Sequence, residues 1–232
     1  MKLLALDTAT EQCSAALWLE GVVSTREAQR PSGHGELILS MIDGLLSAAQ
    51  LPLRELSAIA YGRGPGAFTG VRLAVGVAQG LGFAAGVPLL PISDLRAVAA
   101  QALGRPEAEG ASRVLVCQDA RMGEVYWSCF ESRAGELIAL GSEAVGAPEG
   151  VALPAVWGGE AVLGAGSGFE AHPSLRQRLE GELSIVWPQL RPHAREIAWL
   201  ASREDLAAAL RPDQAQPVYL REQVATTPSR RN

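Results

Sequence analysis

The stretch from Tyr61 to Gly76, YGRGPGAFTGVRLAVG, constrains the fold of this chain more than any other part of the sequence. It holds five glycines and one proline between an apolar run and a helix-like run. It is not a P-loop, since no Gly-Lys-Ser/Thr follows, and it lacks the GxGxxG spacing. One interpretation is an anion site at a helix N-terminus, assisted by Arg63 and Arg72. The other is a tight strand-to-helix turn in which Phe68 fills the core and Thr69 caps the helix, and the residues alone favour it.

The elements around this stretch indicate an α/β chain made of two blocks. A polar, Gly- and Pro-bearing connector at 104–112 separates them and gives the expected boundaries: 1–104, 105–222 and a disordered tail at 223–232. Each block opens with a strand that ends in an aspartate and continues into a hairpin, which is a weak internal repeat. In the first block we expect strands at 2–6, 13–21, 22–28, 56–64 and 86–93, and helices at 34–50, 69–85 and 94–103. In the second we expect strands at 113–120, 124–132, 135–140 and 162–169, a loop-rich segment at 141–161, a helix at 191–210 and an extended stretch at 216–225.

Composition excludes several classes of protein. The 232 residues are 48% hydrophobic and 19% charged, which predicts a folded core, and the net charge of −5 argues against unaided binding of nucleic acid. Three cysteines without CxxC spacing predict buried, reduced thiols, and His34, His172 and His193 lack the spacing of metal ligands. No GxSxG elbow occurs. The N-terminal apolar run is too short for a signal peptide and no window approaches eighteen apolar residues, so we expect a cytoplasmic protein.

Two further features each allow two interpretations. Asp7 and Thr8 follow the first expected strand, where they either contact a nucleotide phosphate or its metal, or form a turn. The segment GAGSG, at 164–168, either lies against an adenosine or is an ordinary glycine turn.

The first two expected helices carry more apolar and small residues than one core requires. On the helix at 34–50 the apolar arc covers roughly half the circumference. On the helix at 69–85 small residues recur every four positions, and each glycine inside a helix costs about 1 kcal/mol relative to alanine. Such spacing lets another helix approach closely. The two rows of small residues are Ala74, Ala78 and Gly82, and Gly76 and Gly80.

Three segments of the chain together resemble the TsaB family, formerly YeaZ: LLALDTAT, YGRGPGAFTGVRLAVGVAQGLGFAAGVPLL and PVYLRE. The resemblance covers the whole first half and returns at 164–168 and 217–222. It implies an ASKHA (actin, sugar kinase, Hsp70) α/β fold with two duplicated lobes of βββαβαβα type, the second degenerate. The family is similar to its catalytic paralogue TsaD, which bears a metal-binding HxxxH. Matching the chain through its strand at 86–93 puts Asp94 and Val98 at the two histidine positions, and an alkyl side chain cannot ligate a metal.

The resemblance implies a function in tRNA modification without catalysis or a metal site. A TsaB subunit pairs with TsaD, the ATPase TsaE binds that pair, and the assembly makes N6-threonylcarbamoyladenosine (t6A) 3′ of the tRNA anticodon. Without TsaD the chain is expected to form a homodimer, and tRNA is reached through the complex. ATP or ADP is expected only in the assembled complex. Two enzymatic alternatives are a glycopeptidase-like hydrolase and a stand-alone nucleotide-binding ATPase.

The resemblance also assigns residues. Apart from the resemblance, the glycine-rich turn and the end of the first strand give the candidate contacts with a nucleotide or anion: Asp7, Thr8, Arg63, Gly66 and Thr69. The implied partner interface uses the helices at 34–50 and 69–85, and we expect Ala78→Arg to abolish pairing while the fold stays intact. The interface residues are Leu39, Ile42, Leu46, Ala74, Val77, Ala78 and Leu81.

Overall fold

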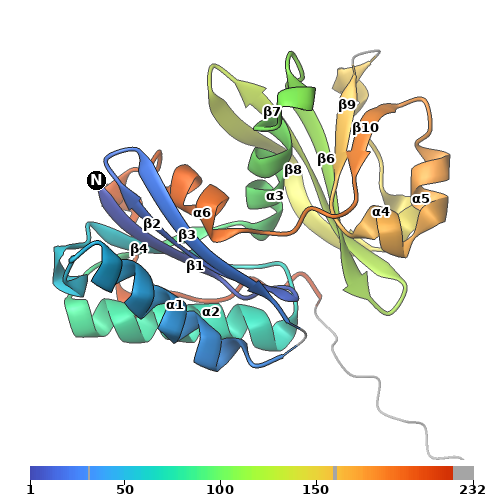
Figure 1. Ribbon diagram of the computed structural model, residues 1–232. Helices are drawn as coiled ribbons and strands as arrows, with labels where there is room; N and C mark the ends of the chain where they lie inside the picture. The colour runs from blue at the N-terminus through green and yellow to red at the C-terminus, as the bar shows by residue number, and fades with distance from the viewer. Residues whose placement is uncertain (31, 159–160, 222–232) are drawn as a thin grey trace, which may run out of the picture.

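The computed structural model describes residues 1–30, 32–158 and 161–221, which form two α/β lobes with one sheet in each (Figure 1). The first lobe has the predicted order βββαβαβα. Its turn at Glu20-Gly21 has positive φ at both residues, as a tight hairpin requires. Its elements are β1 (Lys2–Asp7), β2 (Gln12–Leu19), β3 (Val22–Gln29), α1 (His34–Ala48), β4 (Ala58–Gly62), α2 (Phe68–Ala85), β5 (Leu89–Ile92) and α3 (Asp94–Leu103).

The second lobe repeats this order in reduced form. Two 3-10 turns, Pro148–Gly150 and Ala155–Trp157, follow its third strand where the first lobe has a helix. The named elements are β6 (Arg113–Arg121), β7 (Glu124–Arg133), β8 (Glu136–Gly146), β9 (Val162–Ala165), α4 (Gly168–Ala171), α5 (Pro173–Arg178), β10 (Leu183–Trp187) and α6 (Ala194–Ala201).

The two sheets are mixed and have five strands each. The order is β3-β2-β1-β4-β5 in the first and β10-β9-β6-β7-β8 in the second. The first strand of each block pairs antiparallel with the second and parallel with a later one. Because both faces of these central strands are covered, they read as unbroken apolar runs in the sequence. In β1, Leu3 and Ala5 belong to one apolar cluster, and Leu4 and Leu6 to another.

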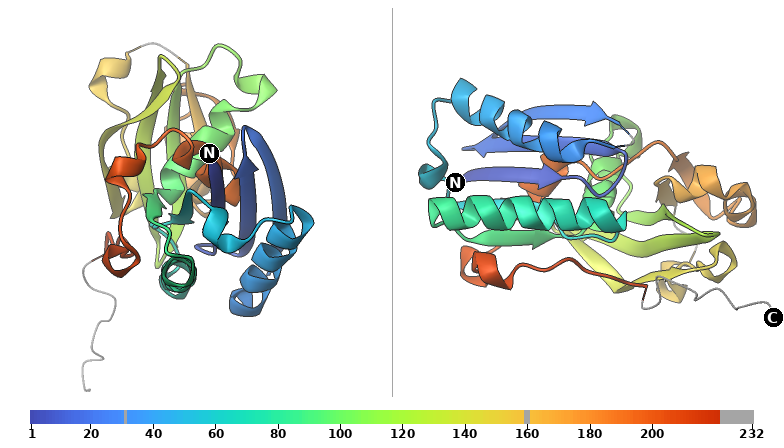
Figure 2. Two further views of the ribbon diagram at one scale, coloured as in Figure 1. Left: turned by 90° about the vertical axis from the view of Figure 1, so that its left-hand side faces the viewer. Right: turned by 90° about the horizontal axis from the view of Figure 1, so that it is seen from below.

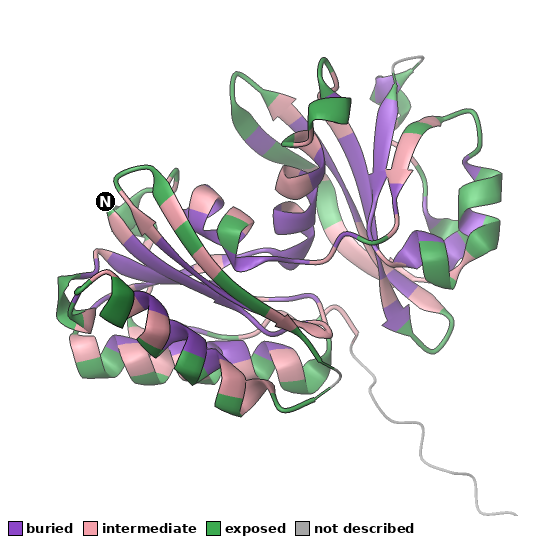
Figure 3. Cartoon of the chain, viewed as in Figure 1, coloured by how far each residue is buried: buried purple, intermediate pink, exposed green. Residues whose placement is uncertain are grey.

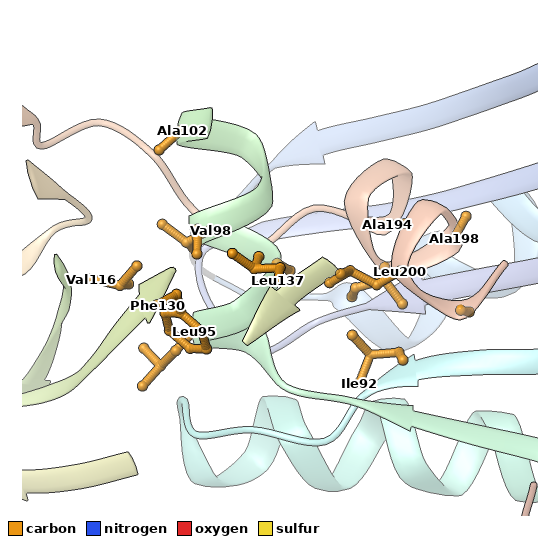
Figure 4. Close-up of a cluster of buried hydrophobic side chains, with 14 of the residues drawn as sticks. Ile92, Leu95, Val98, Ala102, Val116, Phe130, Leu137, Ala194, Ala198 and Leu200 are labelled. Atoms are coloured by element: carbon orange, nitrogen blue, oxygen red, sulfur yellow. The ribbon is translucent and has the colours of Figure 1, made fainter. Parts of the chain in front are cut away.

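Two helices pack on the sheet of the opposite block. Helices α1 and α2 cover one face of the first sheet (Figure 2), whereas α6 from the second block covers the other face. Helix α3 from the first block packs on β6, β7 and β9. One hydrophobic core therefore joins both lobes. Figure 4 shows its centre, where Leu95 and Val98 of α3 lie near Phe130 and Val116 of the second sheet, with α6 beside them.

Several sequence predictions in the second block need correction. Strand β8 continues to Gly146, inside the segment predicted as loop-rich. The helix predicted at 191–210 is shorter, Ala194–Ala201, since His193 caps its start by accepting a hydrogen bond from the Arg195 amide. Strand β10 and helices α4 and α5 were not predicted. Residues 216–221 are extended but join neither sheet, and the predicted tail at 223–232 lies outside the described residues.

The boundary predicted at 104 separates the strands but not the helices. Each sheet draws its strands from one block, while α3 and α6 exchange places. The division of the chain into two domains at residue 104 therefore stays a prediction. In three dimensions, residues 194–201 complete the first lobe.

Candidate functional site

The glycine-rich turn after β4 and the first turn of α2 pack closely against the residues that follow β1. A Cβ atom on Gly70 would lie 2.1 Å from the Thr8 carbonyl oxygen, so only glycine fits there. The Thr8 hydroxyl donates a hydrogen bond to the Gly70 carbonyl at 2.6 Å. The predicted turn is therefore present, but two details were wrong. Helix α2 begins at Phe68 with Ala67 at the N-cap and no side-chain cap, so Thr69 does not cap it, and the Phe68 side chain is exposed rather than filling the core.

Two carboxyl groups meet beneath this turn. Asp7 at the end of β1 and Asp94 at the start of α3 are fully buried, and Oδ1 of each lies beside Gly62. The Gly64 amide donates to Asp94 Oδ2 at 2.6 Å, and the Ala9 amide donates to Asp7 Oδ1 at 3.2 Å. A Cβ atom on Gly62 would lie 2.3 Å from Asp94 Oδ1 and 2.4 Å from Asp7 Oδ1, so glycine is required beside the pair.

Burial changes the protonation of this pair. It raises the pKa of Asp7 to about 6, against an ordinary value of 3.8. It raises the pKa of Asp94 well above that ordinary value, and the neighbouring Asp7 charge raises it further. Two like charges this close are costly in a dry site, so one proton is shared between the carboxyls near neutral pH.

A cleft of about 1190 Å³ separates the lobes beside the turn. Thr8, Gly66 and Thr69 line it, as a nucleotide or anion contact would require. Two other predicted contacts need correction. Asp7 is fully buried beside Asp94, and the Arg63 guanidinium instead pairs with Glu143 of β8 at 3.1 Å.

The second glycine segment also serves close packing. A Cβ atom on Gly166 would lie 2.3 Å from the carbonyl oxygen of Cys117, in the middle of β6. Ser167 lines the cleft, with its hydroxyl donating to Gln118 Oε1 at 2.6 Å. The structure therefore accounts for these glycines by packing, which was one of the two sequence interpretations.

Three arginines that sequence reasoning missed also line the cleft. Arg191 pairs with Glu11 at 2.6 Å, Arg121 pairs with Asp119 at 3.0 Å, and Arg221 pairs with Glu124. Arg121 and Met122 have positive φ at the tip of the β6–β7 hairpin, which bulky side chains rarely adopt. The sequence signal was weak, since the three arginines lie far apart along the chain.

The outer surface of α1 and α2 is the second candidate site, and the structure divides the predicted interface residues. Leu39 is exposed, and Leu46, Val77 and Leu81 are half-buried, so they are available to a partner (Figure 3). The other three are corrections: the side chains of Ile42, Ala74 and Ala78 are buried in the chain's own core.

The second row of small residues on α2 faces outward instead. Gly76 and Gly80 are exposed, and a Cβ atom on either would meet no described residue within 4 Å. A groove of about 480 Å³ runs alongside, lined by Leu39, Leu46 and Leu81 among others. We call this surface the outer helix face and define it by Leu39, Leu46, Gly76, Val77, Gly80 and Leu81.

The side-chain inventory of the described residues adds three findings. All three cysteines are free and buried, as predicted. Within residues 1–30, 32–158 and 161–221, no three His, Cys, Asp or Glu side chains cluster as a metal site. By length and composition alone, α2 is apolar enough to cross a bilayer, although it packs on the first sheet.

Comparison with known proteins gives a consistent assignment. A family model described as TsaD: tRNA N6-adenosine threonylcarbamoyltransferase matches residues 20–225. The tRNA threonylcarbamoyladenosine biosynthesis protein TsaB of Escherichia coli (strain K12) is 38% identical over 234 residues, covering 97% of this chain and 96% of that protein. The protein of the same name from Haemophilus influenzae is 47% identical over 128 residues, covering 55% of this chain and 53% of that protein.

Solved structures agree with this result. YeaZ from Pseudomonas aeruginosa is 42% identical and superposes with a TM-score of 0.83 over 94% of this chain and 99% of that one. An uncharacterised Pseudomonas aeruginosa protein with similarity to the peptidase YeaZ gives 41% identity and a TM-score of 0.84, over 95% and 99% of the two chains. The expected ASKHA-like fold is confirmed by these matches and the two five-stranded sheets. Because the similarity to TsaB spans almost the whole length of both proteins, the chain belongs to the TsaB (YeaZ) family.

Proposed function

We propose that this chain is a non-catalytic subunit of the machinery that makes t6A in tRNA. In this proposal it pairs with the catalytic paralogue TsaD, and the ATPase TsaE binds the pair. The names of its relatives support the pathway. The more specific role, as a partner subunit, depends on the outer helix face.

The observation that carries the proposal is the pair of exposed glycines on α2. Gly76 and Gly80 lie in the interior of an 18-residue helix, where each costs about 1 kcal/mol relative to alanine. Among the described residues nothing lies within 4 Å of a Cβ atom at either glycine, so no contact seen there offsets this cost. Apolar side chains surround them on α1 and α2. A helix from another subunit that crosses at these glycines would explain both features.

The proposed lack of catalysis rests on the positions that match the TsaD histidines. Val98 is an alkyl side chain buried in the core. The Asp94 carboxyl is engaged by the Gly64 amide and by Asp7 in a closely packed site. Since Val98 offers no donor atom, Asp94 would be the one ligand at these two positions, and a single carboxylate does not hold a metal in a dry site.

The remaining parts of the proposal concern assembly. Without TsaD, we propose that two copies of the chain pair through the outer helix face, in the cytoplasm. Because the net charge is −5, tRNA is reached through the complex. ATP or ADP is held only in the assembled complex.

Reconstitution from purified parts tests the role as a subunit. Formation of t6A is measured by mass spectrometry of tRNA nucleosides, with this chain present or left out. We expect loss of the product when it is omitted. Unchanged product formation without the chain would refute the proposal.

Substitutions on the outer helix face test the surface. Gly80→Gln places a long side chain where a partner helix would cross, and Leu39→Glu puts a charge at the exposed Leu39. We expect both to lose co-elution with TsaD in size-exclusion chromatography. Val156→Glu is the matched control, since Val156 is an exposed apolar residue of the second lobe. Retained co-elution of both variants would exclude this surface.

A further inference from the structure

Two aromatic side chains and an arginine from distant parts of the chain meet at the rim of the cleft. Phe68 begins α2, and Tyr219 lies in the C-terminal extended segment. Their ring centroids are 5.5 Å apart and their planes are tilted by 34°. The Arg72 guanidinium lies 3.4 Å from the centroid of the Phe68 ring and 5.2 Å from that of the Tyr219 ring.

This cluster is exposed, which is unusual for two stacked aromatic residues. Phe68 and Tyr219 are each 44% exposed, and both line the cleft. Arg72 is exposed too, and within the described residues no carboxylate lies at ion-pair distance from it. By contrast, the cleft arginines Arg121, Arg191 and Arg221 each have a carboxylate partner. The Arg72 guanidinium covers one face of the Phe68 ring, and the cluster thus presents the remaining exposed aromatic surface beside a positive charge without a carboxylate partner.

Contacts of the residues on both sides of Tyr219 hold this part of the chain in place. The Val218 amide donates a hydrogen bond to the Arg63 carbonyl at 2.8 Å. Two residues after Tyr219, the Arg221 guanidinium donates to the Ala120 carbonyl at 3.2 Å and pairs with Glu124. The aromatic surface is therefore fixed before any ligand arrives, which lowers the entropy cost of binding.

We propose that Phe68, Arg72 and Tyr219 form a binding site for a nucleotide, either free or within single-stranded RNA. Every base has a π-face that stacks on an aromatic side chain, and the adjacent arginine supplies the charge for its phosphate. An acidic peptide would use the charge but not the planar surfaces. The RNA form of the inference rests on the proposed function, because it needs a chain that serves a tRNA-modifying assembly.

Alanine substitutions with a matched control test this site. The probes are ATP and an adenine-rich single-stranded RNA octamer, titrated by calorimetry into the full chain alone and into the chain with TsaD added. We expect Phe68→Ala and Tyr219→Ala each to weaken binding roughly 5- to 100-fold, the range for one lost base–aromatic contact. Phe83→Ala is the control, since Phe83 is 63% exposed near the other end of the same helix.

Each outcome decides the proposal. If the octamer binds and ATP does not, the site is assigned to RNA. If ATP binds and the octamer does not, the site is assigned to a free nucleotide. No binding of either probe, with or without TsaD, overturns the proposal, as does equal weakening in Phe83→Ala or none in Phe68→Ala. Co-elution with TsaD, measured on the same variants, is expected to be unchanged in Phe68→Ala. The co-elution measurement can thus refute the partner role without refuting the nucleotide site, and the titrations can refute the nucleotide site without refuting the partner role.

Discussion

The carboxyls of Asp7 and Asp94 link protonation to stability at the scale of single residues. Their folded-state pKa values are raised, with that of Asp7 at about 6 against 3.8 ordinarily. The folded chain therefore binds more protons than the unfolded chain. The stability contributed by the pair is complete below about pH 4 and is lost as the pH rises through about 6 and beyond.

Asp94→Asn tests this linkage, because an amide mimics the protonated carboxyl at the same size. We expect the free energy of unfolding of the wild-type chain to fall, on the order of 1–3 kcal/mol, between pH 4 and pH 8. The variant should lose most of this fall and be the more stable protein at pH 8. Urea unfolding at several pH values measures it, with Asp43→Asn at an exposed position as the control. Parallel pH profiles for Asp94→Asn and the wild-type chain would contradict the shared proton.

The sequence patterns indicated which residues belong to this site but not which of them lie in contact. The aspartate at the end of the first strand and the special glycines were visible in the sequence. That Asp7 would lie beside Asp94, 87 positions away, depends on how α3 follows β5. Arg63 was expected to meet an anion, and it pairs with Glu143, which lies in a segment predicted as loop.

Helix α2 shows how one element serves two surfaces. Ala74, Ala78 and Gly82 pack inward, and Gly76 and Gly80 face outward. Both rows have the same spacing of four, so the sequence predicted close packing on this helix but not which row serves which neighbour. For this reason the expected result for Ala78→Arg was wrong: a charged side chain at a fully buried position would disrupt the fold.

Gly76→Ala separates stability from pairing on this element. We expect it to raise the free energy of unfolding of the monomeric chain by about 0.5–1 kcal/mol, because alanine favours helix and nothing blocks its methyl group. The same methyl group should weaken binding to TsaD. Chemical denaturation and calorimetric titration measure the two effects.

Gly82→Ala is the internal control for this pair of effects. A Cβ atom on Gly82 would lie 2.9 Å from Leu89 Cδ2, so we expect the substitution to destabilise the chain. If Gly76→Ala also destabilised it, an internal contact at Gly76 would be required.

At the scale of the whole molecule, the main feature is an exchange of helices: α3 of the first block packs on the second sheet, and α6 of the second block packs on the first. The sequence predicted a helix at each of these places, but both sheets offer an apolar surface on which either helix could pack. The choice depends on the crossing of the chain between lobes, which local patterns do not record. The two-block α/β fold could be read from the order of elements, whereas the shared core could not.

The exchange predicts that the first block does not fold alone. A fragment of residues 1–104 lacks α6, and Leu3, Ala5 and Ala60 would be exposed on one face of the sheet. We expect such a fragment to aggregate or to bind a hydrophobic dye, with no cooperative unfolding transition. The full chain under the same conditions is the comparison. A soluble fragment with a sharp transition would show that the first block is an independent domain.

The order of synthesis on the ribosome gives this arrangement a further consequence. Strand β5 ends at Ile92, but α6 begins only at Ala194, so about a hundred more residues must be translated before the first sheet is covered. At typical elongation rates this interval lasts roughly 5–20 s. During it the nascent chain exposes an apolar face of the sheet to solvent. Chaperones that bind such surfaces are therefore expected to act on this chain after its first half has emerged and before its last helix arrives.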